Sequence, residues 1–121
     1  VYDHCMKPQI RDAMAGQDAF TEWAEGITAL ANVGSGYCKF SGLITEAGEG
    51  WTKADLKPFS DHILQSFGPD RVMWGSDWPV CRLKGEYDVW LSAAQSLTAH
   101  LTPLEQAKVF GQNARNFYRL R

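Results

Sequence analysis

The sequence predicts an α/β fold with a parallel sheet, and two observations support this fold class. Three short apolar stretches, each typical of a buried strand, lie at residues 1–4, 37–41 and 71–77. A stretch with the helical spacing of apolar residues follows each of them. Strands that alternate with helices in this way usually pair in parallel and are joined by right-handed crossovers. Because no low-complexity linker interrupts the pattern, residues 1–121 are interpreted as a single domain.

The first helix is predicted to begin near Asp18, a residue type that often caps helix N-termini. Its buried face has the i, i+3, i+4, i+7 spacing of Phe20, Trp23, Ala24 and Ile27. A polar loop over residues 45–50 leads to the second helix. That helix begins at Thr52 with a capping-box pattern in which Asp55 replaces Glu. Its predicted buried stripe consists of Leu56, Phe59, Ile63 and Phe67. Pro58 falls inside the helix, and we expect a kink or a broken first turn there.

Helical spacing returns after Pro79, where one face carries Tyr87, Trp90, Leu91 and Ala94. A capping box with proline at the first helical position, residues 102–105, marks the start of the next helix. Gly111 is interpreted as the stop of that helix, because glycine commonly follows a helix C-terminus. Asn113 is interpreted as the cap of a last helix, which would bury Ala114, Phe117 and Tyr118.

Composition and charge exclude several classes of function. The chain has 121 residues, 45% of them apolar, with five tryptophans, which is enough for a packed core. The formal net charge of -2 provides no basic surface for nucleic acid. Lys and Arg are scattered singly, and no apolar run approaches the length of a membrane span. We therefore expect neither a nucleic acid nor a membrane as a partner.

The three cysteines predict buried thiols. Cys5, Cys38 and Cys81 are odd in number, and no two have the C-x-x-C spacing of a zinc ribbon. Reduced thiols are typical of a cytoplasmic protein, and this is the location we expect. A nucleophilic Cys5 next to His4 is the weaker interpretation, because neighbouring residues in a strand point to opposite faces.

Polar or ionisable residues lie at or near the C-terminal end of every predicted strand. They are His4 on the first, Lys39 and Ser41 on the second, and Ser76 and Asp77 on the third. Taken singly, each has a structural explanation: a core histidine, a strand-edge lysine, a turn former, or an aspartate that opens a turn. In a parallel sheet these ends lie on one side, where α/β proteins bind ligands. The pattern therefore favours a catalytic rim.

Five motifs carry a resemblance to a known family. Val72–Pro79 resembles the last-strand signature of the amidohydrolase superfamily, and the nearest branch comprises the sugar-lactone and dicarboxylate-lactone hydrolases. The other motifs are Asp3–Pro8, similar to Asp-His-x-x-Lys-Pro; Lys39–Gly42, similar to Lys-x-Ser-Gly; Phe67–Arg71, the approach to the last strand; and Gly111–Tyr118, the closing helix. The motifs keep the order of the family and extend over nearly the whole chain.

The resemblance implies a fold and a reaction. The fold would be a TIM-type (β/α)8 barrel of which this chain supplies the C-terminal three βα units, a partial domain. The reaction would be the hydrolysis of a lactone of a sugar acid or dicarboxylate by activated water. Asp77 would take a proton from the water, and His4 would polarise the carbonyl or bind a metal. Lys39, Ser41 and Trp78 would contact the substrate, with Lys39 on the oxyanion or a substrate carboxylate and Trp78 as an apolar wall.

The resemblance leaves the cofactor open between one divalent metal, such as zinc, and none. His4 and Asp77 are the candidate ligands. No His-x-His pair, which the family carries on its first strand, occurs in this sequence. An isolated chain of three strands is expected to have little or no activity.

Two other interpretations remain open at this point. A three-strand piece exposes sheet edges that would associate with a partner, either the missing half-barrel or further copies of the chain, without catalysis of its own. Alternatively, the chain is a small α/β binding domain that shares only local motifs with the family.

Overall fold

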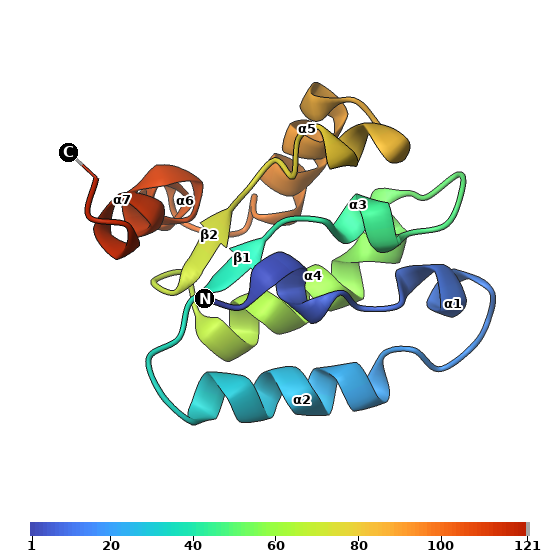
Figure 1. The fold of residues 1–121 in the computed structure, drawn as a ribbon, viewed down its shortest axis with the longest axis horizontal. Coiled ribbons are helices and arrows are strands. Elements are labelled where there is room, and N and C mark those ends of the chain that lie inside the picture. The colour runs from blue at the N-terminus through green and yellow to red at the C-terminus, as the bar shows by residue number, and fades with distance from the viewer. Residues whose placement is uncertain (121) are drawn as a thin grey trace.

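The computed structural model describes residues 1–120, which form a short sheet surrounded by helices (Figure 1). In chain order, the helical turns and strands are η1 (Asp3–Met6), α1 (Ile10–Met14), α2 (Thr21–Asn32), β1 (Cys38–Phe40), α3 (Leu43–Glu46), α4 (Lys53–Phe67), β2 (Val72–Trp74), η2 (Val80–Leu83), α5 (Tyr87–Leu97), α6 (Pro103–Ala107), the π-helical turn η3 (Lys108–Gln112) and α7 (Asn113–Phe117).

The sheet is parallel, as predicted, but its first strand is reduced to a single bridge. β1 and β2 pair with each other. In their register, Cys38 lies opposite Val72 and Phe40 lies opposite Trp74. Tyr2 joins β1 through one parallel bridge to Cys38. The predicted strand at 1–4 is wrong beyond Tyr2, because the chain turns into η1 at Asp3. The α/β fold class is therefore confirmed, with a smaller sheet than expected.

Helix α4 forms the centre of the helical layer. It packs against both strands and contacts α2 on one side and α5 on the other (Figure 1). The predicted stripe of α4 is buried and consists of Leu56, Phe59, Ile63 and Phe67. The helix runs continuously through Pro58, so the broken first turn that we considered does not occur.

The predicted helix starts are confirmed by their hydrogen bonds. Asp18 Oδ1 accepts from the backbone N–H groups of Phe20 and Thr21 ahead of α2. The Thr52 backbone N–H donates to Asp55 Oδ2 at the start of α4, within a complete capping box. Glu105 N–H donates to Thr102 Oγ1 at the start of α6, and the Glu105 carboxylate accepts from the Thr102 backbone N–H.

The C-terminal segment differs from the prediction. Gly111 does not stop a helix, because the chain continues through the π-helical turn η3 into α7. Asn113 does not cap α7 and has helical dihedral angles. Its buried side-chain amide instead donates to the carbonyls of Pro69 and Val72 and anchors α7 to the start of β2. Tyr118 was expected to be buried but is exposed, since it lies one residue beyond the end of α7.

Two further features bear on the predictions. All three cysteines are free and buried, as expected. Among residues 1–120, no helix has the combination of length and apolar character that crossing a bilayer requires.

Candidate functional site

Three of the predicted site residues meet beyond the C-terminal ends of the strands. His4 Nδ1 lies 2.8 Å from the hydroxyl oxygen of Ser41. The other ring nitrogen, Nε2, lies 3.5 Å from Asp77 Oδ1. The second carboxylate oxygen, Asp77 Oδ2, accepts from the hydroxyl of Thr45 at 3.4 Å. A histidine and a carboxylate are thus held face to face, each with a hydroxyl on its far side.

Asp77 is presented by a left-handed turn after β2. Its φ is +55°, a conformation that is uncommon for residues other than glycine and clusters at functional sites. The turn is fixed on both sides. The Trp90 indole N–H donates to the Gly75 carbonyl at 2.8 Å, and the Cys81 N–H donates to the Asp77 carbonyl at 2.9 Å.

His4 is presented by a second left-handed turn, which is longer. His4, Cys5, Met6 and Lys7 all have φ between +51° and +59°. For L-residues this conformation costs about 1–2 kcal/mol each, so surrounding contacts must hold the turn. Gly42 leaves the space that the imidazole occupies. A Cβ at that position would lie 3.0 Å from the Cβ and Cγ atoms of His4, and the φ of Gly42 is itself +72°.

The pair lines a cavity and is neither buried nor fully exposed. The side chains of His4 and Asp77 are 27% and 13% exposed, which leaves them accessible to a ligand but partly shielded from water. The cavity they share measures about 200 Å³ and is completed by Lys7, Gly42, Thr45, Glu46 and Val80.

Lys39 and Ser41 occupy the same rim with different partners. Lys39 Nζ pairs with Asp3 Oδ1 at 3.2 Å, and the hydrogen bond and charge of Lys39 lower the pKa of the Asp3 carboxyl. Ser41 is only 1% exposed, and its hydroxyl is engaged by His4. This placement favours a role for Ser41 in orienting the imidazole over direct contact with a substrate.

Ser76 and Trp78 lie at the outer side of the turn. The Ser76 hydroxyl accepts from the Trp78 backbone N–H at 3.1 Å, and this hydrogen bond closes the turn that contains Asp77. The Trp78 side chain is 62% exposed and is not part of the cavity lining, where Val80 is the apolar residue. The substrate contact of Trp78 stays a prediction.

Cys5 is not suited to act as a nucleophile. Burial raises the pKa of its thiol well above the usual value of 9.0, and the neighbouring Cys38 raises it further. A neutral, fully buried thiol is unreactive. The prediction against a nucleophilic Cys5 is therefore confirmed. The reason given for it was wrong, because Cys5 lies in a turn and not in a strand.

Sequence reasoning missed Thr45 and Glu46. Both lie in the single helical turn α3, where we expected the loop before α4 to begin. A four-residue helix gives no periodic signal, so its side chains could not be assigned to a face. Lys7 is part of a quoted motif but was not predicted to line the site.

His4 and Asp77 are the predicted metal ligands, and Glu46 adds a further carboxylate to the lining of the same cavity. A zinc site takes about three or four protein ligands, usually nitrogen, sulfur and carboxylate oxygen. Within residues 1–120, no three His, Cys, Asp or Glu side chains gather closely enough to hold a metal ion. These two residues would therefore provide part of such a site.

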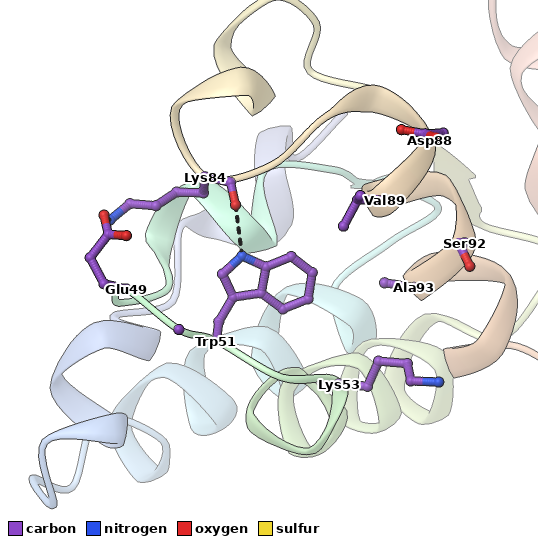
Figure 2. Close-up of a pocket in the computed structure, with 9 residues that line it drawn as sticks. Glu49, Trp51, Lys53, Lys84, Asp88, Val89, Ser92 and Ala93 are labelled. Carbon is purple, nitrogen blue, oxygen red and sulfur yellow. Dashed lines mark hydrogen bonds and ion pairs between the residues drawn. The ribbon is translucent and has the colours of Figure 1, made fainter.

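A larger cavity, of about 700 Å³, lies apart from this rim (Figure 2). Trp51 stands at its centre and donates its indole N–H to the Lys84 carbonyl at 3.0 Å. The Lys84 ammonium pairs with Glu49, and Lys53 donates to Ser96. Its two lysines are thus engaged by partners within the chain, and none of the predicted site residues lies in its lining.

Comparison with known proteins identifies relatives of the chain. The family model described as amidohydrolase matches residues 1–120. The chain is 38% identical over 124 residues to the L-fucono-1,5-lactonase of Burkholderia ambifaria, a match to 99% of this chain and 41% of the relative. It is 35% identical over 126 residues to the L-fucono-1,5-lactonase of Burkholderia multivorans, covering 99% of this chain and 43% of that protein. The chain thus spans less than half the length of these curated relatives.

Solved structures agree with this relationship. Two crystal structures of an amidohydrolase from Burkholderia multivorans, one with bound HEPES and one with bound zinc, match the chain with TM-scores of 0.90 and 0.88. Both are 34% identical and cover 98% of this chain and 44% and 43% of theirs, respectively. An end-to-end match of this kind disfavours the alternative of an unrelated binding domain with shared local motifs. The chain belongs to the amidohydrolase family.

Proposed function

We propose that the protein containing this chain hydrolyses a lactone ring, with Asp77 as the general base and His4 as the group that polarises the lactone carbonyl. The observation that carries this proposal is the pairing of the two side chains, 3.5 Å apart, at the lip of a cavity beyond the strand ends. The names of the two lactonase relatives support the lactone as substrate class. A sugar acid or a dicarboxylate is the parent acid that we propose.

The residue chemistry fits each step. Water that attacks the lactone carbonyl loses a proton to Asp77, while negative charge develops on the carbonyl oxygen. An Nε2–H of His4, with Nδ1 accepting from Ser41, would donate to that oxygen. Ring opening then needs a proton on the leaving alkoxide, which protonated Asp77 would return. Lys39 is the proposed partner of a substrate carboxylate, which would replace Asp3 as the partner of the Lys39 ammonium.

A divalent metal is compatible with these residues. His4 with the opposite tautomer, Nδ1–H donating to Ser41, would leave the lone pair of Nε2 available as a ligand beside Asp77. When bound, such an ion lowers the pKa of water and polarises a carbonyl. Because two ligands hold zinc weakly, the isolated 121-residue chain is expected to lose it on dialysis. About one zinc retained per chain, measured by metal analysis, would contradict this.

The proposed architecture places this chain in a TIM-type barrel. Residues 1–121 would be a single partial domain that provides the last three βα units, with Tyr2, β1 and β2 as neighbouring strands. The cavity of about 200 Å³ is smaller than the roughly 300–1,000 Å³ of ligand pockets, so further walls would come from other parts of the protein. Open strand edges beside Tyr2 and β2 would otherwise favour association between chains.

The test of this function is turnover of a panel of sugar lactones by the intact protein and by Asp77→Asn. Asparagine keeps the size and tolerates the left-handed backbone, but it cannot accept the proton. We expect kcat to fall by about 10²–10⁴-fold with an unchanged melting temperature. The matched control is Asp70→Asn, an exposed carboxylate that pairs with Lys108 at the other end of β2. Near-normal kcat in Asp77→Asn would remove Asp77 from the mechanism.

A further inference from the structure

The left-handed turn His4–Lys7 needs a contact that holds it, because four consecutive L-residues rarely adopt this conformation unsupported. Inside the turn, the Lys7 N–H donates to the His4 carbonyl at 2.8 Å. The Cys5 thiol, a weak donor, points to the Lys39 carbonyl at 3.4 Å. Neither contact ties the backbone of the turn to a rigid neighbouring element.

Trp23 provides that connection from α2. Its indole N–H donates to the Cys5 carbonyl at 2.8 Å. Among the hydrogen bonds within residues 1–120, this is the one that joins the backbone of His4–Lys7 to a side chain of another element.

The indole is itself held firmly. Its ring packs against Phe59 and His62, with ring centroids 5.2 and 5.7 Å away, and against Phe20 at 5.9 Å. Trp23 therefore fixes the Cys5 carbonyl, next to His4 in the chain, relative to α2 and α4.

We infer that Trp23 is a positioning residue for His4: its indole N–H holds the left-handed turn and thereby aims the imidazole at Asp77. This inference rests on the proposed function, because His4 must act in the reaction for its aim to matter. Trp23 does not line the cavity that His4 and Asp77 share. Its effect would pass through the backbone of the turn.

The experiment compares Trp23→Phe with Phe20→Leu in the intact protein, by NMR of the histidine ring resonances and by steady-state kinetics. Both substitutions alter the aromatic cluster, but only the first removes the bond to Cys5. His62 lies 5.7 Å from both rings, so its resonances should move in both variants and report equal disturbance of the cluster. The resonances of His4, assigned with His4→Gln, should move or broaden in Trp23→Phe alone.

The kinetic expectation separates positioning from packing. In Trp23→Phe, kcat should fall about 10- to 100-fold with KM nearly unchanged, while Phe20→Leu keeps kcat near normal. Replacement of Trp23 by 3-benzothienylalanine, which keeps the shape but has no N–H, should reproduce the loss if Trp23→Phe folds poorly. Unchanged His4 resonances, or a kcat equal to that of Phe20→Leu, would overturn the inference. If the intact protein hydrolyses no lactone, the proposed function fails, and the His4 resonances still decide whether Trp23 holds the turn.

Discussion

The two ends of β2 are built in opposite ways. At the C-terminal end, Asp77 has a left-handed backbone and a partly exposed carboxylate that faces His4 across a cavity. At the N-terminal end, the Arg71 guanidinium donates to the carbonyls of Ala31, Gly34 and Gly36. The Cζ atom of Arg71 lies 5.2 Å from the ring centre of Phe67. One end has an unusual backbone conformation and a histidine–carboxylate pair, and at the other end an arginine satisfies backbone acceptors.

Under the proposed function, the two ends of β2 have different tasks. In α/β barrels, residues at the C-terminal ends of strands serve chemistry, and residues at the opposite ends serve stability. Asn113 follows the same rule, since its amide bonds to carbonyls at the start of β2. Substitutions at the two ends should therefore separate stability from activity.

The largest effect on stability is expected at Arg71. In Arg71→Met the carbonyls of Ala31, Gly34 and Gly36 lose their donor, and we expect a loss of about 2–4 kcal/mol in the free energy of unfolding. The kcat of the folded protein should remain near normal. Denaturant unfolding measures the loss, with the exposed Arg115→Met as control. A large fall in kcat without a loss of stability would contradict the division between the two ends.

A smaller effect on stability, together with an effect on activity, is expected at Gly42. In Gly42→Ala the new Cβ meets His4 at about 3.0 Å at a φ of +72°. We expect a loss of about 1–2 kcal/mol in stability and a fall of about tenfold or more in kcat, because the imidazole must move. The control is Gly26→Ala inside α2, where an added Cβ would meet nothing within 4 Å outside the backbone of its own helix, and stability should rise slightly. Normal kcat in Gly42→Ala would mean that the position of His4 is not critical.

The smallest effect concerns Cys5 and appears only at alkaline pH. Burial raises the pKa of its thiol above 9.0, so the unfolded chain loses this proton at lower pH than the folded protein. The thiol's contribution to stability is complete below pH 9 and declines above it. The free energy of unfolding should fall about 1.4 kcal/mol per pH unit more steeply than in Cys5→Ala. Equal slopes for the two proteins between pH 9 and 10 would contradict the raised pKa.

Much of the fold could be predicted because its signals are local. The capping box at Thr52, the cap at Asp18 and the buried stripe of α4 depend on residues a few positions apart, and all three are confirmed. The rim could be predicted for a related reason. Parallel strands bring their C-terminal ends to one side, which places His4, Ser41 and Asp77 together whatever the details of the loops.

The rest depends on contacts between distant segments. The turn at His4–Lys7 opposes the local preference of its residues and exists through partners such as Trp23 and Ser41. Asn113 matches the pattern of a helix cap, but the carbonyls of Pro69 and Val72, more than 40 positions away, determine its role. Sequence patterns identify neither kind of partner.

The most direct test of the central claim is turnover and stability of Asp77→Gly in the intact protein. Glycine adopts the φ of +55° without the cost that Asp77 bears, but it has no carboxylate. The account predicts a melting temperature equal to or above that of the wild type, together with a fall in kcat of at least about 10²-fold. Near-normal kcat, or a marked fall in melting temperature with kcat retained in the folded protein, would show that Asp77 serves the fold and not the reaction.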